Sequence, residues 1–334
     1  MGVPPRTRPM VSIVMPVMNE ASRLDAALAG LRGQTYPADR IEILAVDGGS
    51  TDGTVDLLER EAAADPRIRP LGGPGVNTPA ALNIGIANAR GEIVAYVGGH
   101  GHPDPRFLEL AVDRLESDAR LGCVGGLIIP AGDGETARAA MIARFSVFGV
   151  GRGIYTTDPT VHEIETVQWG VYRKDAVEQA GLFDPELQFG EDEELNYRLR
   201  RAGFRILYDP ALRMTYYARS TFRGLFRQYR NYGRARVRVL RKHPEFLRPK
   251  HVVPGLVVAT LAGAAALPIV ARRLWPLSAL VAATYGSFVA VASVVLARRE
   301  RFSAPHRIAA GLASLHVGYG IGTLLGLVDL VRRR

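Results

Sequence analysis

Up to about residue 215, the chain alternates short apolar runs with segments whose apolar positions recur at helical spacing. The runs are rich in β-branched residues, and each precedes an amphipathic stretch: 11–17 before 20–31, 41–46 before 54–63, and 93–97 before 107–115. This alternation is typical of βαβ units, which build a mostly parallel, buried sheet with helices on both faces. Functional loops of such a sheet lie at the carboxyl ends of its strands. We therefore expect a site in the loops that follow the three apolar runs.

The last third of the chain has a different pattern. Three segments contain no Asp, Glu, Lys or Arg, and each is about as long as the roughly 20 residues that a membrane-spanning helix needs: 251–271, 274–297 and 308–328. We predict three membrane helices, with a buried helical domain as the alternative. The third segment is rich in glycine, so it could pack tightly against another helix or re-enter the membrane. The predicted fold is thus an α/β domain followed by an all-α transmembrane region.

These patterns divide the chain into four parts. We expect an N-terminal tail (1–10), an α/β domain (11–218), a basic amphipathic juxtamembrane region (219–250) and the membrane region (251–334). Segment 136–166 interrupts the strand-helix alternation. We expect it to face an acceptor, with Arg152, Tyr155 and His162 as candidate contacts, or to be a loop with a structural role.

Charge and cysteine content narrow the class of protein. The net charge is +9, and the basic residues stand beside long apolar stretches, which favours anionic lipid over nucleic acid as the partner. Ten cations flank the apolar segments on one predicted side and five on the other, so we expect the α/β domain in the cytoplasm and the chain in the inner cell membrane.

The single cysteine, Cys123, excludes a disulfide framework and indicates a reducing compartment. The first residues lack an apolar h-region, so no cleavable signal peptide is expected.

Two polar loops follow the first two apolar runs. In "DGGSTDGT" (47–54), Asp47 comes directly after a strand, where its carboxylate could accept hydrogen bonds from a bound base or ribose. Alternatively, Asp47 and Asp52 form an Asx-turn and cap the next helix. "PVMNE" ends the previous strand, with Pro16, Asn19 and Glu20. Because both loops converge on one edge of the sheet, a ligand site is favoured.

Four consecutive acids begin the segment "FGEDEELNYRLRRAG" (189–203). At a helix start the macrodipole favours negative charge, so capping acids on a solvated helix are one interpretation. Consecutive positions point in different directions, however, and at most two of the four can serve the same cap. A carboxyl group close to another carboxylate can have its pKa raised into the range that a general base needs.

A basic, aromatic segment precedes the first apolar helix. Its arginines at 223, 227, 230 and 234 lie near one helical face, with Phe and Tyr residues between them. Such a helix is typical of the membrane interface, where its cations lie near lipid phosphates. Some of these arginines could instead bind a diphosphate, which suits the planar guanidinium group.

The ordered set of motifs resembles a known family. "VSIVMPVMNE", "EILAVDGGSTDGT", "ALNIGIANARGEIVAYV", "GVYRKDAVEQAGLFDPELQFGEDEELNYRLRRAG" and the arginine-aromatic helix are similar to inverting family 2 glycosyltransferases of the GT-A fold, over roughly residues 10 to 235. With the trailing apolar helices, the chain most resembles bacterial succinoglycan-type exopolysaccharide transferases.

The resemblance implies roles for individual residues. Asp47 would hold the nucleotide base, and of the pair Glu191 and Asp192, the latter would be the catalytic base. The implied nucleotide-sugar-binding residues are Pro16, Val17, Asn19, Glu20, Asp47, Gly48, Ser50, Asp52, Gly98, Gly99, Arg227 and Arg230. Asn231 stands where processive members usually carry tryptophan, which favours transfer of a single sugar.

The segment "GGHGHPDP" (98–105) departs from the family pattern. Family members usually have an Asp-x-Asp pair here, and its two acids align with Gly98 and His100. A histidine ligand suits Mn²⁺ better than Mg²⁺, which prefers oxygen ligands. His100 is therefore the candidate metal ligand, with His102 or Asp104 assisting, and a turn histidine without metal is the alternative.

The resemblance implies a membrane-anchored, inverting glycosyltransferase. It would move a sugar from a nucleotide-sugar donor to a lipid-linked or polysaccharide acceptor in exopolysaccharide or cell-envelope glycan synthesis. One alternative is a glycolipid-forming transferase that acts on polyprenyl phosphate or diacylglycerol. The other is a non-catalytic nucleotide-sugar-binding partner in an export complex, because an acid is missing at Gly98.

Overall fold

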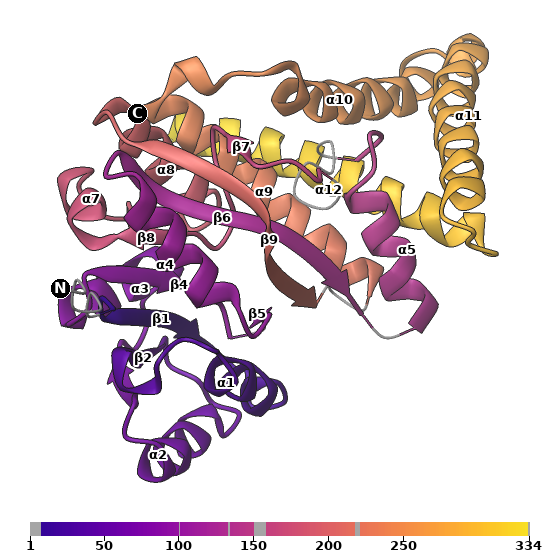
Figure 1. The fold of residues 1–334 in the computed structure, drawn as a ribbon. Coiled ribbons are helices and arrows are strands. Elements are labelled where there is room, and N and C mark those ends of the chain that lie inside the picture. Colours follow the sequence, from indigo (N-terminus) through magenta and orange to yellow (C-terminus); the bar gives the residue numbers. More distant parts are fainter. Residues whose placement is uncertain (1–7, 100, 133, 150–157, 218–220, 333–334) are drawn as a thin grey trace, which may run out of the picture. The chain divides into compact units, whose positions relative to one another are not determined.

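The computed structural model describes residues 8–99, 101–132, 134–149, 158–217 and 221–332. The chain forms two compact units, and Figure 1 labels their elements. The sheet unit comprises residues 1–129 and 155–216, and the helical unit comprises residues 130–154 and 217–334. The described residues 130–132 and 134–149, which we expected within the α/β domain, thus belong with the C-terminal helices.

The first half of the sheet is parallel. Its strands lie in the order β3-β2-β1-β4, with bounds Ile68–Gly72, Ile41–Asp47, Val11–Val17 and Ile93–Tyr96. The helices between them are α1 (Leu24–Arg32), α2 (Thr54–Ala64) and α3 (Thr78–Asn88), with a 3₁₀ turn η1 (Ala38–Arg40) before β2. Val17 pairs with Asp47, so β1 and β2 end at the same level. The loops after them therefore start side by side, as the sequence predicts.

The second half of the sheet is antiparallel, so the sheet is mixed. It contains β8 (Val171–Arg173), β6 (Leu121–Ala131), β9 (Arg205–Tyr217) and β5 (Gly101–Pro103), and the short β7 (His162–Glu163) pairs with β9. Strand β8 joins the two halves, because it lies antiparallel to both β4 and β6. The helices of this half are α4 (Phe107–Ser117), α7 (Lys174–Gln179) and α8 (Glu191–Arg201).

The central strands are apolar on both faces. Every residue of β1 except Pro16 is buried, and β2 is buried up to its last residue, Asp47. Helices cover both faces of such a sheet, which explains why these strands read as continuous apolar runs and not as alternating ones. Two polar side chains inside this layer satisfy each other, because the Ser12 hydroxyl donates to Glu42 at 2.6 Å.

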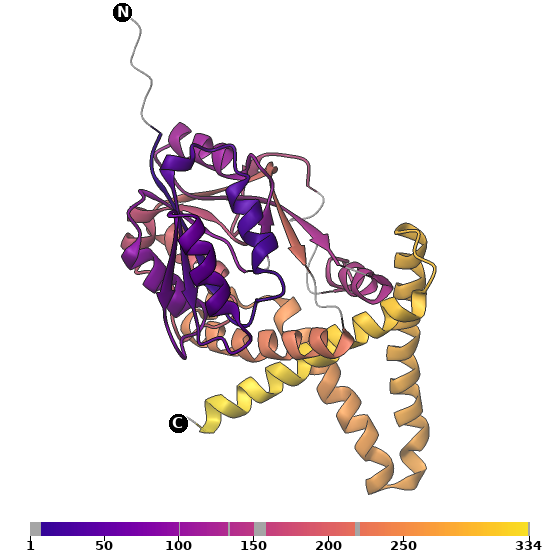
Figure 2. The same ribbon diagram turned by 90° about the horizontal axis from the view of Figure 1, so that it is seen from below.

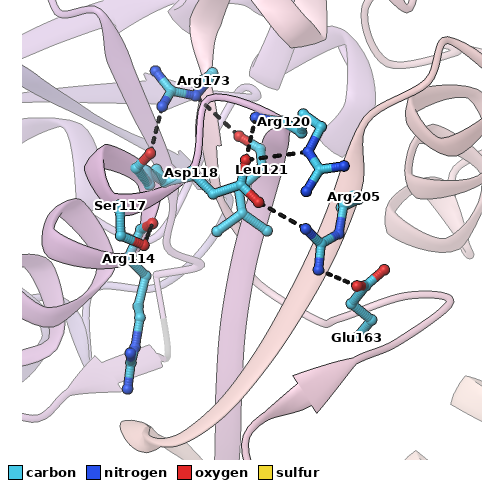
Figure 3. A network of polar contacts seen from close by, with 9 residues as sticks. Arg114, Ser117, Asp118, Arg120, Leu121, Glu163, Arg173 and Arg205 are labelled. Carbon is cyan, nitrogen blue, oxygen red and sulfur yellow. Dashed lines mark hydrogen bonds and ion pairs between the residues drawn. The ribbon is translucent and has the colours of Figure 1, made fainter.

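A polar network ties the antiparallel strands together near the end of α4 (Figure 3). Arg205 of β9 bonds Asp118 at 2.7 Å and also pairs with Glu163 of β7. The backbone N–H of Arg120 donates to Asp118 at 2.8 Å, and Arg173 of β8 donates to the Leu121 carbonyl at 3.0 Å. These contacts join α4, β6, β7, β8 and β9, so this cluster of charges has a structural role.

The helical unit contains five long helices in its described part. They are α5 (Gly134–Arg144), α9 (Phe222–Lys242), α10 (Pro249–Val270), α11 (Trp275–Arg299) and α12 (Pro305–Arg332), with short 3₁₀ turns at Pro244–Phe246 and Arg272–Leu274. By length and composition, α10, α11 and α12 could each cross a membrane. The three predicted apolar helices are therefore confirmed.

Candidate active site

The loops after β1 and β2 form one hydrogen-bonded platform. Asn19 has a left-handed backbone (φ 56°), and its amide oxygen accepts the N–H of Thr51 at 2.9 Å. In return, the N–H of Asn19 donates to the Ser50 hydroxyl at 2.8 Å, and the N–H of Glu20 donates to the Thr54 hydroxyl at 2.9 Å. Asparagine tolerates this backbone conformation better than most residues. The two loops therefore converge as predicted, and hydrogen bonds join them directly.

Asp47 and Asp52 make the Asx-type bonds of the alternative interpretation. One carboxylate oxygen of Asp47 accepts the N–H groups of Gly49 at 2.8 Å and Ser50 at 3.0 Å. Asp52 accepts both the hydroxyl (2.6 Å) and the N–H (3.1 Å) of Thr54, and the hydroxyl bond contributes most to lowering the pKa of Asp52. An ionised carboxylate has about four acceptor positions. The half-buried Asp47 can therefore keep its turn and still accept bonds from a ligand.

The loop after β4 packs against the same platform. Gly98 and Gly99 are buried, and a Cβ on Gly99 would lie 3.1 Å from side-chain carbons of Val17 and of Glu20. The N–H of Gly48 donates to the Val17 carbonyl at 3.0 Å. The ends of β1, β2 and β4 thus meet at one edge, where a side chain at position 99 would be in tight contact with its neighbours. Pro16 lies next to this edge, paired with Val46.

The acid pair of α8 lies next to the end of β4. Gly190 has a left-handed backbone (φ 82°) and leads directly into α8. The Glu191 carboxylate hydrogen-bonds Tyr96, the last residue of β4, and the Asp192 carboxylate accepts the backbone N–H of Trp169. Since β4 leads into Gly98 and Gly99, the pair and the three loops belong to one site.

The environment of the two carboxyl groups raises the proton affinity of both. Burial raises the pKa of both, and the neighbouring charge of Asp192 raises the pKa of Glu191 further. The N–H of Trp169 opposes the increase at Asp192. One oxygen of Asp192, Oδ1, is buried and has no hydrogen-bond partner among the described residues. The pair therefore keeps a proton at higher pH than free carboxyl groups do, and the open oxygen of Asp192 can accept one.

The last acid of the run has a different partner. Glu194 is only 2% exposed and pairs with Arg198 one turn later, with N–O distances of 2.6 and 2.7 Å. Arg198 also donates to the carbonyls of Ala180 (a short contact) and Leu182 (2.6 Å). Through these bonds, α8 holds the loop that leads into its own first turn.

Helix α3 holds the same loop from the other direction. The Asn83 side chain both donates to the carbonyl of Phe183 (2.7 Å) and accepts its N–H (2.9 Å). Asn77, the N-cap of α3, donates to the Pro185 carbonyl at 2.7 Å. Our sequence reasoning missed Asn77, Asn83 and Arg198. The signal for Asn83 was a lone amide within the apolar run "AALNIGIA".

Trp169 is a second feature that the sequence did not reveal. It is a non-glycine residue with a left-handed backbone (φ 50°), a conformation that costs on the order of 1–3 kcal/mol and concentrates at functional sites. Its ring centre lies 5.5 Å from that of Tyr216, and a Cβ on Gly101 would touch the ring at 3.4 Å. Aromatic surface thus adjoins the acid pair, as in many ligand sites.

The predicted metal ligand lies outside the described residues, because His100 is not among them. Within the described part of the chain, no group of three or more His, Cys, Asp or Glu residues could hold a metal. His102 packs on α1, since its Nε2 would lie 2.9 Å from a Cβ on Gly30. Because His100 is not described, the described residues neither complete a metal site nor test the prediction, and the proposed chemistry contains no step on a metal.

The remaining candidates lie elsewhere in the chain. Arg227 and Arg230 belong to the helical unit, where both are exposed on α9, and their role stays a prediction. Arg152 and Tyr155 lie outside the described residues. His162 has its Nδ1 3.1 Å from the Thr160 carbonyl, and its ring lies 5.3 Å from that of Tyr208.

Sequence comparisons place the chain among known proteins. A family model described as glycosyl transferase family 2 matches residues 12–180. The succinoglycan biosynthesis protein ExoA of Rhizobium meliloti (strain 1021) is 32% identical over 325 residues, which cover 96% of each chain. A dolichyl N-acetyl-α-D-glucosaminyl phosphate 3-β-D-2,3-diacetamido-2,3-dideoxy-β-D-glucuronosyltransferase of Methanococcus voltae is 27% identical over 239 residues, or 70% of this chain and 74% of the relative.

Two solved structures share the fold. The mannosyltransferase PcManGT of Pyrobaculum calidifontis, in complex with GDP-Man and Mn²⁺, superposes with a TM-score of 0.60 at 19% identity, over 97% of this chain and 89% of that one. GalNAc-T7 with UDP, GalNAc and Mn²⁺ gives a TM-score of 0.52 at 17% identity, over 69% and 48%. At these identities, the likeness shows the fold alone.

Proposed function

The chain belongs to glycosyl transferase family 2, and from this premise we propose that it transfers a sugar, with inversion, from a nucleoside diphosphate donor to a lipid-linked or polysaccharide acceptor. The observation that carries the proposal is the partly buried acid pair beside the loops of β1, β2 and β4, with one buried Asp192 oxygen that has no hydrogen-bond partner among the described residues. The relation to ExoA supports a role in exopolysaccharide or cell-envelope glycan synthesis.

The proposed chemistry is a single displacement. Asp192 takes the proton of an acceptor hydroxyl while that oxygen attacks the anomeric carbon, opposite the leaving nucleoside diphosphate. The bond to the diphosphate breaks as the new glycosidic bond forms, and the electron pair leaves on the phosphate oxygen. A base with a raised pKa suits this step, because general-base catalysis works best with a pKa near the working pH. Glu191 stays protonated in this step and therefore adds no second negative charge to the site.

Three membrane-length apolar helices indicate that the enzyme is membrane-associated. We propose the inner cell membrane, with the sheet unit in the cytoplasm, where nucleotide sugars are available. The cation count of the sequence supports this orientation. The acceptor would then be a lipid-linked glycan, or, as the alternative, polyprenyl phosphate or diacylglycerol.

The activity test uses the detergent-solubilised enzyme. Release of nucleoside diphosphate is measured with a panel of uridine, guanosine and thymidine diphosphate sugars and membrane lipid as acceptor. We expect release with one donor, and only when acceptor is present. A correctly folded enzyme that releases nothing from any donor would favour the non-catalytic alternative.

Donor binding is expected to depend on Asp47. In Asp47→Asn, the amide oxygen can still accept the N–H groups of Gly49 and Ser50, so the turn is kept. The second oxygen is replaced by a donor NH₂, which cannot accept a bond from the base. We expect roughly ten-fold weaker donor binding by calorimetry, since a bond to a charged group contributes about 1.5–3 kcal/mol. Asp56→Asn on exposed α2 is the matched control, and unchanged affinity in Asp47→Asn would remove Asp47 from the donor site.

We also propose that His100 ligates Mn²⁺ at the diphosphate. The calorimetric titration is repeated with Mn²⁺, with Mg²⁺ and with a chelator, for the wild type and for His100→Ala. Donor binding is expected to strengthen with Mn²⁺ more than with Mg²⁺, and His100→Ala is expected to lose this gain. Equal binding in Mn²⁺ and in chelator would contradict the assignment.

A further inference from the structure

Helix α12 makes its most extensive contact with α9 and not with the other two apolar helices. Figure 2 shows α9 and α12 side by side, while α10 and α11 project away from α12 as a hairpin. All four helices belong to the helical unit. The sequence left open whether the glycine-rich third segment packs tightly or re-enters the membrane, and the contacts show tight packing.

The two helices run parallel and in register. A Cβ on Gly318 would meet the backbone of Phe226 at 2.7 Å, and one on Gly322 would meet the backbone of Arg230. One on Gly326 would approach the Arg234 carbonyl at 3.0 Å. Each step of four residues along α12 thus matches a step of four along α9. Small residues at this spacing let two helix backbones approach closely.

An ion pair continues the contact to the end of α12. Arg234 bonds Asp329 with both arms of its guanidinium group, at 2.5 and 2.8 Å. From Gly318 to Asp329, α12 therefore lies directly beside α9. If this part of α12 entered the membrane, α9 would have to enter it to the same depth.

Helix α9 cannot enter the hydrocarbon layer. Its cations occupy every turn, and six of them are exposed: Arg223, Arg227, Arg230, Arg234, Arg241 and Lys242. Arginine in the hydrocarbon core is unfavourable and is rare there. A helix that spanned the membrane from Ile308 to Val328 would descend about 30 Å, the thickness of that core. The part of α12 beside α9 therefore stays at the membrane surface.

The other apolar helices contact α12 over only part of their length. Gly320 lies against Pro254 and Val258, near the beginning of α10. The C-terminal half of α11 contacts α12 from Tyr285, whose hydroxyl lies 3.3 Å from His316 Nδ1, to Leu296, which shares a core cluster with Leu312. Farther from α12, α10 and α11 contact each other, and the Ser278 hydroxyl donates to the Ala264 carbonyl at 2.6 Å. The far end of this hairpin exposes large apolar side chains, among them Ile269, Val270, Trp275 and Leu280.

The free face of α12 also has the character of an interfacial helix. Leu325 (40% exposed), Val328 (46%) and Val331 (75%) are spaced to lie on one side of its last turns. Exposed apolar side chains at this spacing, next to a cationic helix, match the boundary between headgroups and acyl chains. A lipid surface is the partner that fits both features.

We propose that α9 and α12 lie together in the membrane surface, that α10 and α11 enter the bilayer as a hairpin, and that α12 does not cross. The C-terminal end then lies on the same side of the membrane as the sheet unit. With this topology, the cations are distributed more unequally between the two sides of the membrane, as the positive-inside rule predicts. Arg332, Arg333 and Arg334 join the cation-rich side, which changes ten against five into thirteen against two.

The test is cysteine labelling in sealed membrane vesicles with a membrane-impermeant maleimide. Cys123 is fully buried and stays in place, so the wild type gives the background. Arg332→Cys reports the end of α12, and Glu59→Cys, on exposed α2, reports the sheet unit. We expect both positions to be labelled in vesicles of the same orientation. Labelling in vesicles of opposite orientation would overturn the proposal, and the result does not depend on enzymatic activity.

A second measurement tests the α9–α12 contact itself. Gly322→Val places carbon atoms against the backbone of Arg230, whereas Gly263→Val, in α10, meets nothing within 4 Å. We expect Gly322→Val to lower the unfolding temperature by several degrees and to expose the end of α12 to protease, with little change in Gly263→Val. Equal behaviour of the two variants would show that the close contact does not exist.

Discussion

Asp192→Asn is expected to lower kcat by about 10²–10⁴-fold while donor affinity changes little. The substitution keeps the shape of the side chain but removes the group that accepts the hydroxyl proton. Donor binding is spared, because the platform residues Asn19, Asp47 and Ser50 bond one another and not Asp192. The measurements are initial rates of nucleoside diphosphate release and calorimetric titration of the donor. Asp25→Asn, an exposed acid in the first turn of α1, is the matched control.

The pH profile should identify the same group. Burial raises the pKa of Asp192 to about 7, so kcat/KM should rise with pH through this region and level off above it. An ordinary carboxylate base would already be fully active well below pH 6. If kcat/KM were flat from pH 5 to about 8, or if Asp192→Asn kept wild-type activity, Asp192 would not be the base.

The raised pKa also predicts an effect on stability. Between about pH 4 and 7, the folded chain keeps a proton on Asp192 that the unfolded chain releases, so this group stabilises the fold less as the pH rises. Asparagine carries no such penalty. We expect Asp192→Asn to unfold a few degrees higher than the wild type at pH 8, with the difference vanishing near pH 4. A lower unfolding temperature at pH 8 would show that the carboxylate is stabilised in place.

Arg198→Ala is expected to destabilise the sheet unit by about 3–5 kcal/mol. The reason is the almost fully buried Glu194, whose charge would lose its guanidinium partner. The carbonyls of Ala180 and Leu182 would lose their donors as well. Because these bonds hold the loop before Glu191 and Asp192, activity should fall even at temperatures where the variant is folded.

The measurement is thermal unfolding of the purified chain, with activity recorded well below the transition. Arg200→Ala is the matched control, since Arg200 is exposed on the same helix and lies 6.0 Å from the ring of Tyr197. Arg198→Lys should be intermediate, because a lysine keeps the charge but lacks the fork that reaches several acceptors. If Arg198→Ala unfolded like Arg200→Ala, the ion pair with Glu194 would not contribute to stability.

Several features could be predicted from the sequence because they depend on local patterns. The strands at 11–17 and 41–46 read as continuous apolar runs, and the structure has β1 and β2 within one residue of these bounds. A strand's last residue leads directly into its loop, so the convergence of "PVMNE" and "DGGSTDGT" followed from parallel pairing. The acid run and the three apolar helices were likewise visible in the order of residues alone.

Other features were missed because their local signals are weak. Strand β3 is short, only its first residue, Ile68, is buried, and it contains Pro70. The antiparallel half of the sheet is built from strands far apart in the sequence, such as β5 and β9. Local sequence patterns do not predict which of these strands pair. Helix α5 looked like part of a linker, because the contacts that place it with the C-terminal helices are tertiary.

The sequence by itself determined which functional groups are present and where they lie along the chain. It showed which loops carry polar groups, which acids are adjacent, and which helices are apolar enough for a membrane. Only the tertiary structure decided how these groups act. It placed the acid pair, partly buried, next to Tyr96 and Trp169, and desolvation there raises the pKa of both carboxyls. It also set the glycines of α12 against the cationic α9. Burial and contact between distant segments depend on the whole fold, whereas apolar periodicity and charge are properties of neighbouring residues.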